Sequence, residues 1–323
     1  MQDFAGRLAV ITGAGSGMGR ELALALAREG CRLALCDITQ DSAEETAAAC
    51  TAAGGAGLKV TAHRCDVASE ADVLNFRDAV LAQHETDHVH LLFNNAGIGG
   101  GGSFLTDERS EWERTFAVCW YGVYYGSRAF LPLLVAAEAG HIVNTSSVNG
   151  FWASLGPGVP HTAYSAAKFA VKGFTEALIN DLRLNAPHVQ ASLVMPGHIG
   201  TGIARNTVKL LRGHEPGDMT ADEVAEARRR MLARGMPVGN VPDDHIRAAL
   251  RQQAEDFQEK APLSAADAAA IILDGVRAGR WRILVGRDAE ALDAAVRAAP
   301  EQAYEPDFTQ RIQTLGFLGG EPS

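Results

Sequence analysis

Three side chains with reactive chemistry lie close together in the middle of the chain. Tyr164 and Lys168 stand four residues apart in YSAAK, so they share one face of a helix. A lysine ammonium one turn from a phenol stabilises the phenolate and makes it a better proton acceptor. Upstream, the apolar run HIVNTSS ends in Ser146 and Ser147, which places a hydroxyl at the end of a predicted strand. These residue types suit proton exchange with a substrate oxygen.

A glycine-rich turn near the N-terminus suits a nucleotide. The run LAVIT leads into TGAGSGMGR and then directly into a helical pattern. Glycines let the backbone approach a pyrophosphate, which the exposed N–H groups and the positive helix end attract. The spacing follows TGxxxGxG through Thr12, Gly13, Gly17 and Gly19, and Met18 departs from strict GxGxxG. No Gly-Lys-Ser/Thr follows, so the turn is not a P-loop.

Asp37 ends the second predicted strand, twenty residues past Gly17. A carboxylate there can accept hydrogen bonds from the adenosine ribose hydroxyls and repels a 2′-phosphate, which favours NAD over NADP. The alternative is a helix N-cap or turn residue in DITQDS. The positive charges of Arg20 and Arg32 could weaken the preference for NAD over NADP.

Short apolar runs alternate with segments of helical composition along most of the chain. Strands are predicted at residues 8–12, 32–36, 58–65, 89–94, 141–146, 189–195 and 282–286. Helices are predicted at 21–29, 41–53, 70–84, 111–139, 164–184, 264–278 and 288–299. The alternation predicts an α/β doubly wound Rossmann fold with a seven-stranded parallel sheet, whose carboxyl edge binds ligands.

The alternation breaks once, and the break divides the chain. Residues 1–201 form the dinucleotide-binding and catalytic core, 202–262 an inserted, enlarged helical substrate cap, and 263–300 the completion of the core. Met219, Met231 and Met236 are available to line an adaptable surface in the cap, although plain packing is the commoner role of methionine.

The C-terminal tail, residues 301–323, carries three aromatic residues that we expect to pack on the body or on a neighbouring subunit. They are Tyr304, Phe308 and Phe317.

Composition excludes several classes of protein. Lys and Arg total 29 against 39 Asp and Glu, so the net charge of −10 disfavours nucleic-acid binding. The five cysteines form no CxxC pair, so neither a metal site nor a disulfide framework is predicted. The beginning MQDFAGRLAVITG has no basic segment followed by a long apolar run, and no apolar stretch could span a bilayer. We expect a cytoplasmic enzyme without a membrane partner.

Taken together, the motifs resemble the short-chain dehydrogenase/reductase family, in its short single-domain branch. The likeness rests on TGAGSGMG, the pair Asp66-Val67, NNAG at 94–97, Ser147 with YSAAK, and PGHIGT at 196–201, in that order. It covers residues 4–201 and the final strand. The resemblance implies a homodimer or homotetramer, because members of the family commonly associate through the two long helices beside the catalytic site.

The resemblance also implies roles for individual residues. Tyr164 would be the general acid/base, Lys168 would lower its pKa and bind the nicotinamide ribose, and Ser147 would position the substrate oxygen. Residues predicted to contact the cofactor are Gly13, Ser16, Gly17, Met18, Gly19, Asp37, Ile38, Asp66, Val67, Asn95, Ala96, Gly97, Tyr164, Lys168, Pro196, Ile199 and Thr201. Taken singly, Asp66 could cap a helix, Asn95 could hydrogen-bond the backbone groups at the end of a strand, and Pro196 could belong to a plain turn.

Two departures from the family pattern stand near the predicted site. Cys119 occupies the position where many members have an asparagine that holds a water in the proton relay; otherwise it is a small buried apolar residue. The segment between Ser147 and Tyr164 is longer than we expect for the family. Predicted substrate contacts are Asn149, Phe151, Trp152 and His198, although the aromatic pair could equally be local core. His161 could reach the site or simply start the helix.

We therefore expect an NAD-dependent oxidoreductase that interconverts a secondary alcohol and a ketone on a small-molecule substrate that is moderate to large in size and partly apolar. The alternative is a regulatory Rossmann scaffold that binds nucleotide with little turnover. The intact set of Ser147, Tyr164 and Lys168 argues for the enzyme.

Overall fold

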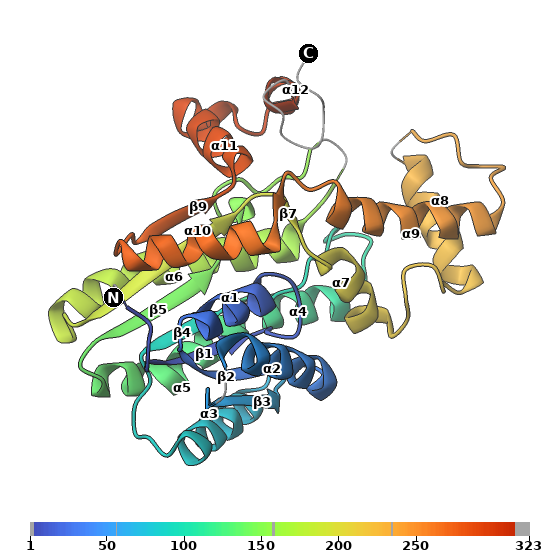
Figure 1. Ribbon diagram of the computed structural model, residues 1–323. Coiled ribbons are helices and arrows are strands. Elements are labelled where there is room, and N and C mark those ends of the chain that lie inside the picture. Colours follow the sequence, from blue (N-terminus) through green and yellow to red (C-terminus); the bar gives the residue numbers. More distant parts are fainter. Residues whose placement is uncertain (1–2, 56, 157–158, 234, 314–323) are drawn as a thin grey trace.

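The computed structural model describes residues 3–55, 57–156, 159–233 and 235–313 (Figure 1). At its centre lies a seven-stranded sheet with the order β3-β2-β1-β4-β5-β6-β9, in which every neighbouring pair is parallel. Its strands are β1 (Leu8–Thr12), β2 (Arg32–Asp37), β3 (Val60–Arg64), β4 (Leu91–Asn94), β5 (Gly140–Thr145), β6 (Val189–Pro196) and β9 (Arg282–Val285). The predicted seven-stranded parallel sheet is confirmed.

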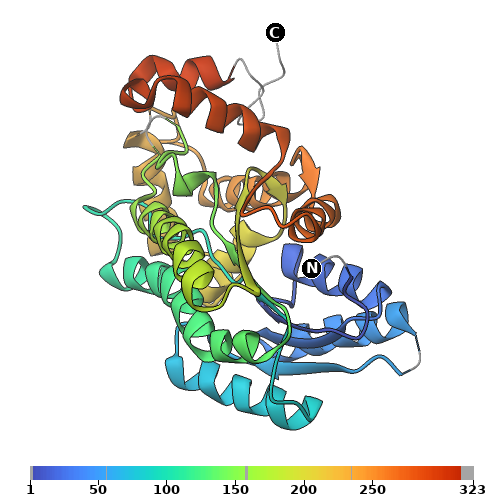
Figure 2. The same cartoon turned by 90° about the vertical axis from the view of Figure 1, so that its left-hand side faces the viewer.

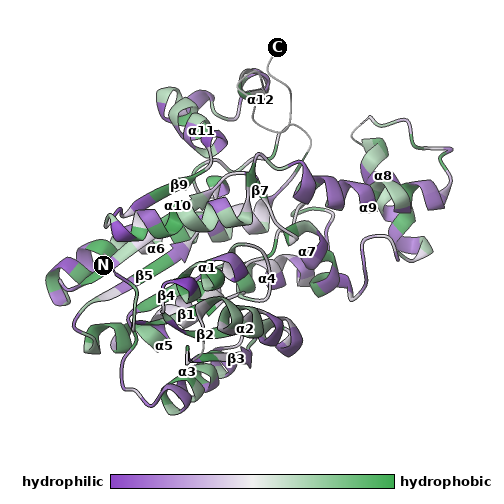
Figure 3. Ribbon diagram, viewed as in Figure 1, coloured by the Kyte–Doolittle hydropathy of each residue, from purple (hydrophilic) through white to green (hydrophobic). Residues whose placement is uncertain are grey.

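Helices cover both faces of this sheet (Figure 2). One layer contains α1 (Gly17–Arg28), α2 (Gln40–Gly54) and α10 (Ala265–Arg277), and the other contains α3 (Glu70–His84), α5 (Gly122–Ala136) and α6 (Thr162–Asn185). Side chains alternate between the faces along each strand, so Ala9 and Ile11 join the first apolar core and Leu8 and Val10 the second. Burial on both faces explains why most of the strands are largely apolar, although β3 and β5 also contain polar residues (Figure 3). The doubly wound Rossmann fold is therefore confirmed.

The order of the strands also locates the ligand edge. β1 pairs with β2 on one side and with β4 on the other, so the chain changes direction across the sheet between these two neighbours. Open α/β sheets bind ligands at the carboxyl ends of strands beside such a switch point.

The segment predicted as helical at 111–139 is helical but not uniform. It consists of α4 (Arg109–Phe116), the π-helical turn η1 (Ala117–Tyr121), and α5. A π-turn places one extra residue in a helical turn and often lies at a functional site. Here the turn contains Cys119.

The inserted segment folds into three helices, α7 (Ile203–Arg212), α8 (Ala221–Ala233) and α9 (Asp243–Glu259). A small parallel sheet that the sequence did not predict joins its ends, because β7 (Ile199–Gly200) pairs with β8 (Leu263–Ser264). α8 and α9 extend away from the main sheet, and α9 is largely hydrophilic (Figures 1 and 3).

The chain continues through α11 (Arg287–Ala298), η3 (Pro300–Gln302) and α12 (Pro306–Gln313). As expected of the tail, Phe308 packs on the body, with its ring centroid 5.9 Å from that of Trp152. The Tyr304 hydroxyl accepts a hydrogen bond from Ala153 N at 3.0 Å. Phe317 lies outside the described residues. Within the described part of the chain, no helix has both the length and the apolar character needed to cross a membrane.

Candidate active site

Two neighbouring elements bring Ser147, Tyr164 and Lys168 to the carboxyl edge of the sheet. Ser147 follows β5 and begins the 3-10 turn η2 (Val148–Gly150), where its side chain accepts a hydrogen bond from Asn149 N at 3.1 Å. Tyr164 and Lys168 lie in the first two turns of α6. The start of α6 is anchored because the backbone N–H of Thr162 donates to the carbonyl of Gly102 at 3.0 Å.

Lys168 is buried beneath the tyrosine ring. Its Nζ lies 5.3 Å from the centroid of the Tyr164 ring and donates to the carbonyl oxygen of Thr145 at 2.9 Å. The side chain is 2% exposed, and burial lowers the pKa of its ammonium group. The strand-end carbonyl therefore fixes the cation beside the phenol.

The pKa of Tyr164 reflects opposing influences. Burial raises the pKa of the phenol above its usual value, and the nearby Cys119 thiol adds to the rise. The nearby Ser147 hydroxyl lowers the pKa of Tyr164 but does not reverse the shift. The phenol thus holds its proton at neutral pH, which suits a proton donor.

His161 stands immediately against the tyrosine. The two ring centroids are 4.7 Å apart, with 35° between the ring planes. Burial lowers the pKa of His161 to about 4, so the imidazole is neutral at physiological pH. His161 both precedes α6 and reaches the site, although the sequence could not decide between these roles.

The glycine turn lies at the ends of β1 and β4. Gly13 has a φ of +62°, and a Cβ on it would come within 2.7 Å of Ala96 Cα. The Thr12 hydroxyl accepts hydrogen bonds from the backbone N–H groups of Asn95, at 3.0 Å, and Ala96, at 3.1 Å. The Asn95 amide in turn donates to the Thr12 carbonyl at 3.1 Å. The turn therefore packs against the loop after β4 so closely that no space remains for a side chain on Gly13.

Asp37 also contacts this turn. It lies at the end of β2, followed by Ile38, and its Oδ2 accepts a hydrogen bond from Gly15 N at 2.9 Å. A carboxylate beside the first glycine turn fits the ribose of a dinucleotide, whose phosphates fit the N-terminus of α1. The residues present thus suit the cofactor that the motifs imply.

Asp66 and Val67 follow β3 at the same edge. Asp66 Oδ1 accepts from Ala68 N at 3.0 Å, and its Oδ2 pairs with Arg114 Nη1 at 2.9 Å, a contact that the sequence did not predict. The cap of α3 is Ser69, whose side chain accepts from Asp72 N. Asp66 is therefore not the helix cap that its position also allowed.

PGHIGT brings the end of β6 to the glycine turn. Pro196 closes β6, Ile199 lies in β7, and a Cβ added to Gly17 would lie 3.2 Å from the Thr201 side chain. On the other side of the site, a Cβ on Gly97 would lie 3.5 Å from Lys168 Nζ. The remaining predicted cofactor contacts, Ser16, Met18 and Gly19, belong to the turn and the first turn of α1.

The four predicted substrate residues have other partners in the structure. The Asn149 amide donates to the carbonyls of Trp152 and Ser154, so it shapes the loop after Ser147. Trp152 is 1% exposed and its indole donates to the Ala303 carbonyl at 2.7 Å, which is the local-core alternative.

Phe151 and His198 likewise face other parts of the protein. The Phe151 ring packs near Arg282, with the guanidinium carbon 5.8 Å from its centroid. His198 Nε2 lies 2.7 Å from the Phe257 carbonyl oxygen, and this contact connects the β6–β7 turn to α9. Of the long segment between Ser147 and Tyr164, Pro157 and Gly158 lie outside the described residues.

Comparison with known proteins assigns the family. A family model described as short chain dehydrogenase matches residues 7–211. The chain belongs to the short-chain dehydrogenase/reductase family. The oxidoreductase SadH of Mycobacterium tuberculosis is 37% identical over 298 residues, which are 92% of each chain.

Solved structures of the short-chain dehydrogenase/reductase family agree with this assignment. A member from Burkholderia phymatum in complex with NAD is 33% identical with a TM-score of 0.73, over 94% of this chain and 95% of that one. A metagenomic short-chain oxidoreductase in complex with NADP is also 33% identical, with a TM-score of 0.53, over 60% of this chain and 83% of that one. Oxidoreductase chemistry and nucleotide binding therefore follow from the family, whereas the relatives differ in cofactor.

Cys119, the departure from the family pattern, is fully buried in η1. Its Sγ donates a hydrogen bond to the Ile98 carbonyl at 3.2 Å. A Cβ on Gly97 would lie 3.8 Å from the same sulfur. The thiol thus makes a polar contact near Lys168 and does more than fill space.

The inserted segment contains a cavity of about 400 Å³ between α7, α8 and α9, lined by apolar side chains and by charged ones that include Arg212, Glu223 and Arg230. Met219, Met231 and Met236 line it together with Phe257, as the sequence suggested for these methionines.

A second cavity, of about 360 Å³, lies between α7 and the glycine turn. Sequence reasoning missed that α7 contacts this turn, because no local pattern marks the contact.

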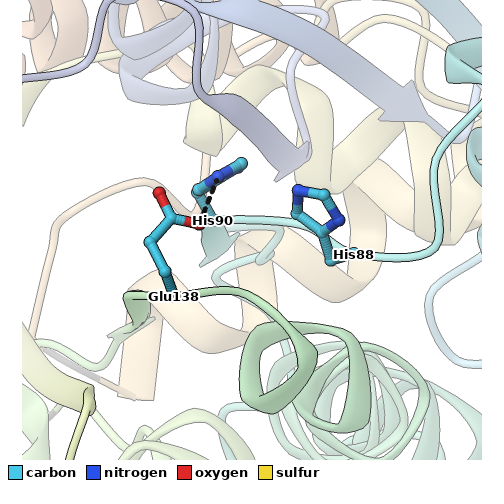
Figure 4. A group of neighbouring side chains, drawn as sticks. All are labelled: His88, His90 and Glu138. Carbon is cyan, nitrogen blue, oxygen red and sulfur yellow. Dashed lines mark ion pairs between the residues drawn. The ribbon is translucent and has the colours of Figure 1, made fainter.

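A third group of side chains lies away from this edge, where β4 begins and α5 has ended (Figure 4). His88, His90 and Glu138 place candidate metal-ligand atoms within 4.8 Å of one another. However, His90 Nδ1 accepts from Leu8 N at 3.2 Å, so a neutral ring carries its proton on Nε2, 3.6 Å from Glu138 Oε2. Arg7 pairs with the same carboxylate. The group therefore fits a hydrogen-bonded charge cluster better than a metal site.

Proposed function

We propose that this protein is an NAD-dependent dehydrogenase that interconverts a secondary alcohol and a ketone. Tyr164 exchanges a proton with the substrate oxygen, Lys168 stabilises the phenolate and binds the nicotinamide ribose, and Ser147 positions the oxygen. The observation that carries the proposal is the position of Lys168 Nζ, which the Thr145 carbonyl holds at 2.9 Å and which lies 5.3 Å from the centroid of the Tyr164 ring, at the edge where Ser147 follows β5. This arrangement supports proton transfer at one point on the carboxyl edge.

The two directions of reaction make different demands on Tyr164. Ketone reduction needs a protonated phenol, which the raised pKa supplies. Alcohol oxidation needs the phenolate, which requires positive charge near the ring. When bound, the nicotinamide dinucleotide accepts or supplies the hydride and carries a positive charge in its oxidised form. Lys168 supplies the second positive charge.

The choice of NAD over NADP is supported by Asp37. Its carboxylate stands beside the glycine turn, where it can bind ribose hydroxyls and repel a 2′-phosphate. The Burkholderia relative holds NAD and the metagenomic relative holds NADP, so the proposal for this chain rests on its own carboxylate.

The substrate class follows from the inserted segment. A cavity between α7, α8 and α9, lined by methionines together with charged residues, supports a partly apolar substrate of moderate to large size, with α7 to α9 as the substrate cap. Residues 1–201 and 263–300 would then form the catalytic core.

A homodimer or homotetramer built on α5 and α6 completes the proposal. Tyr121 and Tyr124, in and next to η1, are 41% and 36% exposed, and Phe169 on α6 is 41% exposed. Apolar surface gathered on two neighbouring helices supports an interface between subunits.

The deciding experiment follows reduced cofactor by absorbance while the purified protein is mixed with NAD and a panel of secondary alcohols. Wild-type protein should turn over at least one, and Tyr164→Phe should lose about 1,000-fold or more of the rate. Tyr164→Phe should bind NAD within about twofold of wild type, because the phenol bonds the substrate oxygen. Tyr121→Phe is the matched control and should keep full activity. Tight NAD binding without turnover on any alcohol would favour the scaffold alternative.

A further inference from the structure

The inserted segment carries a cation to the nucleotide turn. The cavity of about 360 Å³ is lined on one side by Ser16 and Gly17 of that turn and on the other by Arg205 and Asn206 of α7. Gly200 and Thr201 of PGHIGT, with the following Gly202, complete the wall between them. The cavity therefore lies where the positive end of α1 meets the inserted helix.

We propose that Arg205 binds the diphosphate of the dinucleotide, which makes α7 a part of the cofactor site. The inference rests on the proposed nucleotide binding and adds a contact from outside the Rossmann core. Guanidinium groups pair with phosphate oxygens through two N–H groups at once, and they keep their charge at every physiological pH.

Contacts of α7 hold Arg205 in place. The Asn206 amide donates to Ser16 Oγ at 3.1 Å, which ties α7 directly to the glycine turn. One residue further, the Thr207 hydroxyl accepts from Gly99 N at 2.8 Å. These two hydrogen bonds hold α7 against the glycine turn and against the loop after β4. Arg205 is the neighbour of Asn206, which makes the first of them.

The guanidinium is oriented but keeps donors to spare. Its Nε and Nη2 donate to the two carboxylate oxygens of Glu215, each at 2.7 Å. Arginine has five N–H donors, and among the described residues Nη1 has no hydrogen-bond partner. The side chain is 56% exposed, so a phosphate can reach it without breaking the pair with Glu215.

The charges around the cavity make Arg205 important for an anion. Glu21 also lines the cavity and would repel a diphosphate. Arg205 is the cationic side chain in the described lining, and it offsets this carboxylate. If Arg205 lost its charge, the diphosphate would meet Glu21 without compensation.

Lys209 provides a matched control on the same helix. Its Nζ pairs with the same Glu215 carboxylate at 2.6 Å, yet Lys209 does not line the cavity. Neutralising either cation removes one partner of Glu215, but only neutralising Arg205 removes a cation from the diphosphate path.

The test measures dissociation constants by calorimetry for NAD, for ADP-ribose and for adenosine, with wild type, Arg205→Gln, Arg205→Lys and Lys209→Gln. Arg205→Gln should weaken NAD and ADP-ribose by about tenfold, and adenosine by less than about twofold, because adenosine has no phosphate. Arg205→Lys should restore most of the affinity, and Lys209→Gln should bind all three ligands as wild type does. Raising the salt concentration should narrow the gap between wild type and Arg205→Gln.

Several outcomes would overturn the inference. Equal NAD affinity of Arg205→Gln and wild type would exclude the contact, and an equal loss in Lys209→Gln would assign the effect to Glu215. A matching loss for adenosine would point to a disturbed turn. If wild type bound neither NAD nor ADP-ribose, the proposed nucleotide binding itself would fail, which these measurements separate from a failure of Arg205 alone.

Discussion

The thiol of Cys119 and the carbonyl of Ile98 are joined by a hydrogen bond of 3.2 Å, inside a π-helical turn next to Lys168. The bond fastens the helix after β4 to the strand-end loop that follows Asn94. A sulfhydryl is a weak donor, but a fully buried carbonyl benefits from any partner. Cys119 therefore serves as a hydrogen-bond donor, although a buried cysteine is often only an apolar core residue.

Substitutions at Cys119 should separate the contribution of the hydrogen bond to the free energy of unfolding from the contribution of the side-chain volume. Cys119→Ser keeps a donor and should unfold within about 1 kcal/mol of wild type, whereas Cys119→Ala should lose about 1–2 kcal/mol because Ile98 O becomes unpaired. Urea unfolding measures both. Cys50→Ala, at another buried cysteine, controls for lost volume. Equal stability of the serine and alanine variants would show that the bond contributes nothing.

Asp37 allows a test of cofactor choice that spares the glycine turn. Asp37→Asn keeps an oxygen that can accept from Gly15 N but removes the charge that opposes a 2′-phosphate. The preference for NAD over NADP should fall by about tenfold or more, measured as the ratio of the two dissociation constants. Asp41→Asn, in the first turn of α2, should leave the ratio unchanged. An unaltered ratio in Asp37→Asn would mean that another group selects the cofactor.

Titration of His161 should not appear in the pH dependence of the turnover rate. Its pKa of about 4 keeps the ring neutral above about pH 5.5, so it adds no inflection near pH 6.5. His161→Phe retains a ring against Tyr164 and should give a profile of the same shape. An inflection near pH 6.5 that disappears in His161→Phe would show that the imidazole titrates during catalysis.

Buried histidines should make the fold sensitive to mild acid. Burial lowers the pKa of His84 to about 4 and of His141 to about 3, below the unfolded value near 6.5. Unfolded chains therefore bind more protons in this window, and stability falls as pH drops from about 6.5 toward 4 by up to about 1.4 kcal/mol per pH unit for each histidine.

Urea unfolding at several pH values measures this slope. His141→Gln should flatten the slope, and substitution of the exposed His245 should not. A stability that stays constant between pH 6.5 and 5 in the wild type would contradict the prediction.

Local patterns in the sequence predicted most of the core. Most strands contain a short apolar run because the sheet is covered on both faces, so the runs at β1 and β4 were visible without any knowledge of their partners. The order of Ser147, Tyr164 and Lys168 along the chain predicted a group at the carboxyl edge, and the structure places these residues there, after β5 and in the first turns of α6.

Long-range contacts were beyond those patterns. Trp152 looked like a substrate wall by its position, yet its partners Ala303 and Phe308 come from the far end of the chain. The contact of Asn206 with Ser16 crosses 190 positions. The π-turn at Cys119 has no signature in composition, because its geometry depends on packing against neighbouring elements.

The pairing of β7 with β8 has a consequence for how this enzyme could be altered. Ile199 pairs with Leu263 and Gly200 with Ser264, so the chain leaves the Rossmann core and returns to it at one point. The residues between are thus joined to the core at this paired stem and also through α7, where Asn206 contacts Ser16 and Thr207 contacts Gly99. A segment of another length grafted at the stem should therefore leave β6 and α10 in place only if it keeps α7, so we expect the part beyond α7 to be the easier one to exchange.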